Sequence, residues 1–200
     1  MKNPMIKNTV ILTVITLVSG LLLGLVYQVT KEPVALRAKE TQEAAFAKVL
    51  PGADTFEEVE LPKESGKYAN DVEKAVIGKN SGGEIGMVFL VTNHEGYGGD
   101  ISMAVGVSTD YSVTGLEILS LSETPGLGMR AKEPEFMAQY KGMEEDDFTL
   151  TGNSAQADVV TGATKAVSEK VDAISGATIT STAVNNGVHA ALEYYRFLNQ

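Results

Sequence analysis

The run TVILTVITLVSGLLLGLVYQV, from Thr9 to Val29, contains no charged side chain in 21 residues. A helix of this length crosses the hydrocarbon core of a bilayer, which is about 30 Å thick. A cleaved signal peptide has an apolar region of only about 7–15 residues and small residues before its cleavage site, and neither feature occurs here. The run therefore predicts one uncleaved membrane-spanning helix within an N-terminal segment of residues 1–30.

Charge is distributed unevenly on the two sides of this run. Two of the 16 basic residues and none of the 26 acidic residues lie in residues 1–30, so residues 31–200 carry a net charge of −12. Lys2 and Lys7 favour a cytoplasmic N-terminus, whereas Lys31, Arg37 and Lys39 beyond the run oppose it. Long domains cross a membrane largely regardless of charge, so the acidity of residues 31–200 does not oppose the extracytoplasmic location that Lys2 and Lys7 favour, and we expect them there.

Composition limits the chemistry of residues 31–200. Their acidity repels phosphate backbones, so we expect no nucleic-acid partner. The chain has no cysteine, which excludes disulfides, thiolate nucleophiles and iron–sulfur clusters. Its two histidines, His94 and His189, lie far apart in the sequence, so no metal site is expected. If the protein carries electrons, the carrier must be an organic cofactor.

Helical signals begin residues 31–200, and strand signals follow. The Ala-, Glu- and Lys-rich stretch from Lys31 to Leu50 predicts a stalk helix that Pro51-Gly52 ends. Four later runs are rich in Val, Ile and Leu, and short links with turn residues separate them, which predicts an antiparallel meander. These runs are Lys74–Lys79, Ile85–Asn93, Ile101–Ser108 and Leu116–Ser122.

Two further helices are expected after the strands. AKEPEFMAQYKG, residues 131–142, predicts a short helix with Pro134 in its first turn. The last stretch has an apolar stripe at helical spacing, and Ser181 or Thr182 can cap its start. The stripe consists of Val184, Val188, Ala191, Tyr195 and Leu198. We therefore predict a stalk over residues 31–52 and an α+β domain over residues 53–200, in which helices cover an antiparallel sheet.

Two nearly identical heptapeptides precede the last helix. DVVTGAT ends at Thr164, and DAISGAT ends at Thr178. In the second copy, Gly176 and Ala177 allow close approach to the backbone, and the helix N-terminus beside them favours a phosphate group. A tight turn with an N-cap explains the same residues without any ligand. The first copy leads into only six linker residues, and a plain turn fits it better.

A second glycine-rich stretch, ETPGLGMR from Glu123 to Arg130, follows the last predicted strand. A rigid turn followed by a flexible one can place backbone N–H groups and the apolar side chain of Leu127 against a flat ring. Sequences of this kind are also ordinary loop material. The same two interpretations apply to HEGYGGD, in which Tyr97 lies among glycines.

In this order, the N-terminal anchor, GYGGDI, ETPGLG and DAISGATITS resemble the membrane-bound FMN-binding family. The match is nearest to the G subunits of the Rnf complex, an ion-translocating ferredoxin:NAD oxidoreductase. The resemblance covers essentially the whole chain, and Ser-Gly-Ala-Thr with its upstream Asp is its most specific part. C subunits of the sodium-translocating NADH:quinone reductase are similar but generally longer, and they remain an alternative.

The resemblance implies a covalent FMN cofactor. In that family a flavin transferase takes the FMN moiety from FAD, joins its phosphate to the final Thr of the motif, here Thr178, and recognises the upstream Asp, here Asp172. Other residues implied near the flavin are Ser175, Gly176, Ala177, Thr180, Glu123, Thr124, Leu127 and Gly128. No catalytic residue is implied, because the protein would relay electrons between the ferredoxin and NAD branches of an ion-translocating complex. The implied partners are the other integral and peripheral subunits of the complex, the transferase during maturation, and membrane lipid.

Two functions of other classes stay open at the level of the sequence. A membrane-anchored flavin-binding regulatory protein would share these motifs without passing electrons on. A hydrolase that used Glu123 would need a partner base, and no Ser–His or similar arrangement accompanies this residue. Thr164 also satisfies the attachment pattern, and we predict modification at Thr178 because a long helix follows that copy.

Overall fold

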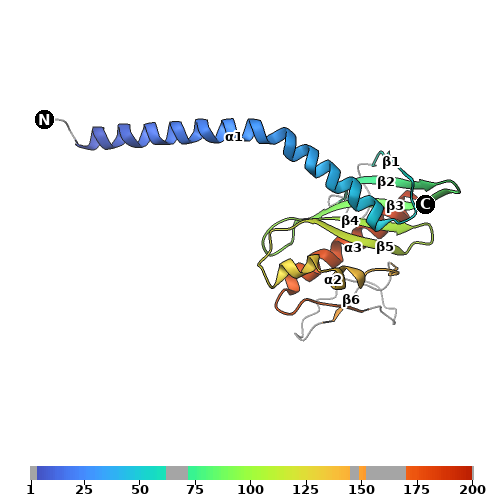
Figure 1. Cartoon of the computed structure of the whole chain (residues 1–200). Coiled ribbons are helices and arrows are strands. Elements are labelled where there is room, and N and C mark those ends of the chain that lie inside the picture. Colours follow the sequence, from blue (N-terminus) through green and yellow to red (C-terminus); the bar gives the residue numbers. More distant parts are fainter. Residues whose placement is uncertain (1–3, 62–71, 145–148, 152–169, 200) are drawn as a thin grey trace. The chain divides into compact units, whose positions relative to one another are not determined.

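The computed structural model describes residues 4–61, 72–144, 149–151 and 170–199 (Figure 1). The chain divides into two units, Met1–Thr41 and Gln42–Gln200. The heptapeptide that ends at Thr164 lies outside the described residues.

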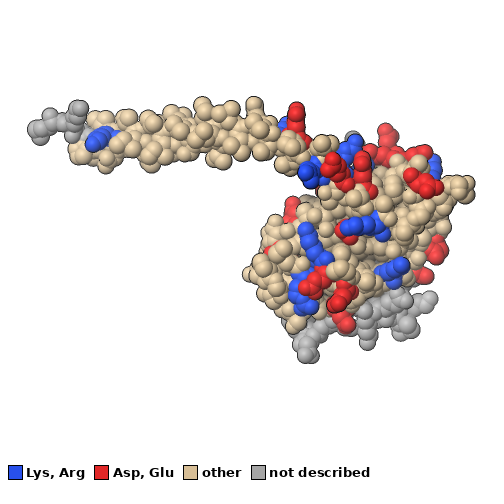
Figure 2. All heavy atoms as spheres, viewed as in Figure 1, with Lys and Arg blue, Asp and Glu red and all other residues tan. Residues whose placement is uncertain are grey.

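A single helix, α1 (Pro4–Val49), contains both the predicted membrane span and the predicted stalk, and it continues through Pro33. Its most apolar window of 18 residues has a mean hydropathy of 2.5 and is not buried, so α1 is long and apolar enough to cross a membrane. The first unit shows no charged side chain over most of its length in Figure 2. The hydroxyls of Thr9, Thr13 and Thr16 donate to backbone carbonyls one turn earlier, which satisfies them without water.

The second unit is built on a five-stranded antiparallel sheet in the order β1-β2-β3-β4-β5. The strands are β1 (Thr55–Val59), β2 (Val72–Asn80), β3 (Gly83–Asn93), β4 (Ile101–Ser108) and β5 (Val113–Ser120). Strands β2 to β5 confirm the predicted meander. β1 was not predicted, because Glu57 and Glu58 interrupt its apolar pattern. These two residues form ion pairs with Lys79 and Lys74 of β2, at 2.5 and 2.6 Å.

An apolar layer covers each face of this sheet. On one face, α3 (Thr178–Leu198) packs against β3 and β4, and the predicted stripe is buried except for the half-buried Leu198. On the other face, a second cluster joins the end of α1 and the residue after it to the sheet. It consists of Ala45, Phe46, Val49, Leu50, Val76, Val88, Leu90 and Ala104. An ion pair of 2.6 Å between Lys48 and Glu117 lies beside this second cluster. The predicted α+β class, with helices on an antiparallel sheet, is therefore confirmed.

The short helix predicted over residues 131–142 is divided into two pieces. A 3₁₀ helix, η2 (Gly128–Lys132), is followed by α2 (Pro134–Ala138). Glu133 lies between them in an extended conformation, φ −68° and ψ 133°, because a residue before proline is disfavoured in the helical region. Pro134 begins α2, as predicted. Further on, β6 (Thr149–Thr151) and β7 (Lys170–Asp172) form a parallel pair.

Candidate functional site

The Ser-Gly-Ala-Thr motif forms a tight turn between β7 and α3. The amide of Ala177 donates to the carbonyl of Ile174 at 2.9 Å, and Gly176 has a φ of +77°, which favours glycine. α3 begins at Thr178, whose side chain is exposed. In a helix with this start, the amides of Thr178, Ile179 and Thr180 have no helical acceptors. The turn therefore presents a hydroxyl and three N–H groups at the positive end of a long helix.

The predicted cap at Ser181 or Thr182 was wrong, because the helix begins at Thr178 with Ala177 as its N-cap residue. Ser181 is fully buried inside the first turn instead. Its hydroxyl accepts from the amide of Ile174 and donates to the carbonyl of Ala177, each at 3.0 Å. The Ser181 side chain therefore connects Ile174, before the turn, to Ala177 at the start of the helix. Capping preferences, which consider only adjacent residues, do not indicate this role.

The ETPGLG stretch lies directly against this turn. The amides of Leu127 and Met129 both donate to the carbonyl of Thr124, at 3.1 and 3.2 Å, which closes the loop. The Cδ2 atom of Leu127 lies 3.1 Å from the position that a Cβ on Gly176 would occupy. The two motifs that the sequence singled out independently are therefore neighbours in space.

Exposed apolar side chains gather on these same segments. Outside α1, the large apolar side chains that the described residues expose are Tyr97 (72 %), Ile179 (54 %), Met129 (42 %), Leu127 (41 %) and Phe197 (41 %). Tyr97 belongs to HEGYGGD, Leu127 and Met129 belong to ETPGLGMR, and Ile179 lies in the first turn of α3. We call these four side chains the apolar rim. They fit a planar apolar ring that a phosphate tethers at the helix N-terminus.

The candidate residues of the two motifs differ in their exposure. Ser175, Gly176 and Thr124 are exposed, whereas Ala177 and Gly128 are buried in the turn and the loop. The side chains of Glu123 and Thr180 are buried as well, with exposures of 6 % and 1 %. The structure thus brings all of these residues to one end of α3, some at the surface and others directly beneath it.

Asp172, at the end of β7, is exposed, and its backbone is held by Gln139. The amide of Asp172 donates to Oε1 of Gln139 at 2.8 Å, and Nε2 of Gln139 donates to the carbonyl of Asp172 at 3.5 Å. The Gln139 side chain therefore pairs with this strand as a neighbouring strand would. No local pattern indicates this contact, because 33 residues separate the two partners.

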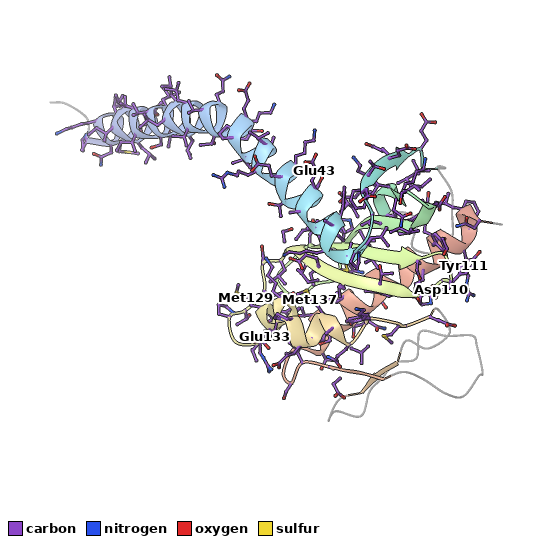
Figure 3. The ribbon with its side chains drawn as sticks, turned by 45° about the vertical axis from the view of Figure 1, so that its right-hand side comes forward. Glu43, Asp110, Tyr111, Met129, Glu133 and Met137 are labelled. Carbon is purple, nitrogen blue, oxygen red and sulfur yellow. The ribbon has the colours of Figure 1, made fainter. Side chains whose placement is uncertain are left out.

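A separate open hollow of about 400 Å³ is lined by Asp110, Tyr111, Glu144 and Arg196. Hydrogen bonds from Ser108 and Ser112 lower the pKa of the Asp110 carboxyl, so this acid is well suited to remain charged. Arg196 lies 18 residues after Thr178 on α3, which corresponds to about 27 Å along the helix axis. Figure 3 shows Asp110 and Tyr111 at one end of the unit and Met129, Glu133 and Met137 toward the other. The hollow is therefore distinct from the Thr178 terminus.

The two histidines lie on different elements: His94 follows β3, and His189 lies in the middle of α3. His94 is exposed and contacts Asp100, with 2.8 Å between Nδ1 and Oδ1. Among the described residues, no group of three or more His, Asp or Glu side chains is arranged to hold a metal ion.

Residues 96–193 match the family model of the FMN-binding domain, and residues 1–49 match that of the RnfG N-terminal region. The matched FMN-binding segment contains GYGGD of the first glycine-rich stretch, the whole ETPGLG stretch, the Ser-Gly-Ala-Thr turn and most of α3. These residues fit the cofactor, because they offer free amides for a phosphate and an apolar rim for a flat ring. Fold and site together define a membrane-anchored FMN-binding protein.

Curated relatives match almost the whole chain. The G subunit of an ion-translocating oxidoreductase complex from Methanosarcina acetivorans is 35 % identical, over 94 % of this chain and 93 % of the relative. The G subunit of the Na⁺-translocating ferredoxin:NAD⁺ oxidoreductase complex of Acetobacterium woodii is 34 % identical, over 97 % and 93 %. The G subunit of the proton-translocating ferredoxin:NAD⁺ oxidoreductase complex of Clostridium ljungdahlii is 29 % identical, over 96 % and 92 %.

The chain therefore belongs to the family of Rnf complex G subunits, which confirms the resemblance inferred from its motifs. The names of the last two relatives specify different ions, so membership in this family does not determine which ion is moved.

Sequence reasoning missed three contributors to the site. Met129 and Ile179 directly follow the two motifs, and their apolar character beside glycine-rich turns was an available signal. Gln139 had no such signal, because its contact with Asp172 joins residues 33 positions apart in the sequence.

Proposed function

We propose that this chain is the FMN-bearing electron carrier of an Rnf-type membrane complex and that its flavin is joined covalently to Thr178. The position of Thr178 carries the proposal: its exposed hydroxyl lies at the first residue of a 21-residue helix, beside three amides without helical acceptors. A phosphodiester formed there gains hydrogen bonds and favourable interaction with the helix dipole.

Attachment requires a flavin transferase and FAD. Oγ1 of Thr178 forms a bond to the FMN phosphorus, the pyrophosphate bond of FAD breaks, AMP leaves, and the hydroxyl proton passes to solvent. Asp172 is the acidic residue that the transferase would recognise. Its exposed side chain and its backbone bonds to Gln139 support this role, because together they present the carboxylate in a fixed place six residues before Thr178.

The chain's own residues then bind and orient the cofactor. Leu127, Met129, Ile179 and Tyr97 supply apolar surface for the ring, while Thr124 and Ser175 offer polar groups at its edge. Gly176 and Ala177 keep the backbone accessible to the phosphate. The bound flavin supplies transfer of one or two electrons. A covalent link prevents loss of the cofactor to an aqueous compartment.

The proposal places the second unit on the extracytoplasmic side, with α1 in contact with membrane lipid. The carrier would pass electrons between other integral and peripheral subunits, linking the ferredoxin and NAD branches to ion translocation. The named complexes of its relatives support this place in a complex. The match of residues 1–49 to the RnfG N-terminal region favours an Rnf complex over an NADH:quinone reductase.

Flavin fluorescence on a denaturing gel tests the proposal. The chain is produced together with a flavin transferase, and wild type is compared with Thr178→Ala and Thr178→Ser. Fluorescence should stay with the wild-type band and disappear in Thr178→Ala, and Thr178→Ser should restore part of it because a hydroxyl is retained. A fluorescent Thr178→Ala band would show that the flavin is attached elsewhere.

A further inference from the structure

Glu123 is the one buried acidic side chain among the described residues, with an exposure of 6 %. It follows β5 and opens the ETPGLG loop. Burying a carboxylate is costly unless hydrogen bonds or charges compensate for it. Among the ion pairs of the described residues, none involves Glu123. Its burial therefore depends on hydrogen bonds and on its immediate neighbours.

The Glu123 carboxylate lies among three backbone segments. Oε1 accepts a hydrogen bond of 3.3 Å from the amide of Gly98 and lies 3.1 Å from the position that a Cβ on Gly96 would occupy. Oε2 lies 2.7 Å from the position of a Cβ on Gly128. Any side chain at Gly128 would collide with the carboxylate, so the glycine and the acid are matched in shape.

Thr180 connects this arrangement to the attachment turn. Its Oγ1 atom also lies 2.7 Å from the Cβ position on Gly128, so the two oxygens can be no farther apart than twice that distance. Thr180 is two residues after Thr178 in the first turn of α3. The carboxylate therefore lies close to the first turn of α3, at whose N-terminus the flavin phosphate would be held.

Each apolar member of the rim belongs to a segment that Glu123 contacts or adjoins. Tyr97 lies between Gly96 and Gly98, Leu127 and Met129 flank Gly128, and Ile179 precedes Thr180. The carboxylate thus bonds to the Gly98 amide and adjoins Gly128, beside which Thr180 also lies. The negative charge also lies in a poorly hydrated place, where its field is weakly screened.

We propose that Glu123 is a positioning residue for the flavin. Its carboxylate holds the segments of the apolar rim in place, and its negative charge lowers the midpoint potential of the flavin. The inference rests on the proposed attachment of FMN at Thr178. Electrons that arrive on a flavin add negative charge to it, and a fixed carboxylate nearby disfavours that change. Removing the charge while keeping the side-chain shape should therefore make the flavin easier to reduce.

The test uses the full chain, produced with a flavin transferase and purified from membranes in detergent. Glu123→Gln keeps the side-chain size and the acceptor for Gly98 but removes the charge. We expect covalent flavin content equal to wild type and a midpoint potential shifted to a more positive value. Glu117→Gln is the matched control: this acid of β5 pairs with Lys48 on the opposite face of the sheet, and its removal should leave the midpoint unchanged.

The outcomes separate this inference from the function on which it rests. If wild type carries no covalent flavin, or carries it on a residue other than Thr178, the proposed function fails and the inference falls with it. If Glu123→Gln carries wild-type flavin on Thr178 with an unchanged or more negative midpoint, the inference alone is overturned.

If Glu123→Gln does not accumulate, a second variant tests the role of Glu123. Glu123→Asp keeps the charge but withdraws it by one methylene from Gly98 and Gly128. We expect a smaller positive shift of the midpoint, together with faster hydrogen exchange at the Gly98 amide. If both quantities equal those of wild type, the position of the carboxylate affects neither the rim nor the flavin, and the positioning role is overturned.

Discussion

Replacing Ser181 by alanine should loosen the turn that presents Thr178. The Ser181 hydroxyl accepts the hydrogen bond of the buried Ile174 amide, at 3.0 Å. Without the hydroxyl, this buried donor loses its acceptor, which costs about 1–3 kcal/mol. The carbonyl of Ala177 keeps its bond from the Ser181 amide at 3.0 Å, so the second lost bond adds little. We therefore expect Ser181→Ala to lower the free energy of unfolding by about 2 kcal/mol.

Thermal unfolding of the fragment Gln42–Gln200 measures this effect. For a unit of about 160 residues, each kcal/mol shifts the midpoint by about 2–4 °C, so the fragment should melt about 4–8 °C lower. Ser175→Ala, at an exposed position of the same turn, should change the midpoint little. A Ser181→Ala midpoint within about 1 °C of wild type would refute the reasoning, because the hydroxyl would then not be securing the turn.

Three further predictions concern the anchor, its orientation and the flavin rim. The full chain should stay with membranes through high-salt washing, and deletion of residues 1–30 should yield a soluble, folded domain; release of the full chain by salt alone would contradict the span of α1. Protease added to spheroplasts should digest the second unit, whereas its survival, while a known external protein is cleaved, would reverse the orientation. Leu127→Ala should keep covalent flavin but shift its midpoint or its absorbance fine structure, because a side chain that touches the Gly176 turn is truncated. An unchanged spectrum and midpoint would mean that the loop is structural only.

The elements that local patterns determine were predictable. The runs rich in Val, Ile and Leu and the turn residues between them indicated β2 to β5, and the stripe from Val184 to Leu198 indicated the buried face of α3. β1 was missed because its acidic residues hide an edge strand whose charges pair with lysines of β2. The start of α3 was misplaced because the Ser181 hydroxyl serves a buried amide of the preceding turn instead of capping the helix.

The candidate site was predictable in its parts but not in its assembly. Each glycine-rich motif was visible in the sequence, and their order indicated the family. The contact of Leu127 with the turn at Gly176 joins residues 49 positions apart and depends on how η2 packs against α3. The burial of Glu123 likewise depends on two loops closing over it, which no local pattern encodes.

The central claim is that one flavin is attached, at Thr178. Peptide mass spectrometry of the trypsin-digested, transferase-matured chain tests it most directly, because cleavage after Lys165 and Lys170 places Thr164 and Thr178 on different peptides. We predict a single FMN adduct, on the peptide from Val171 to Arg196, with the modified residue at Thr178. An adduct on the peptide that ends at Lys165, alone or in addition, would contradict the account.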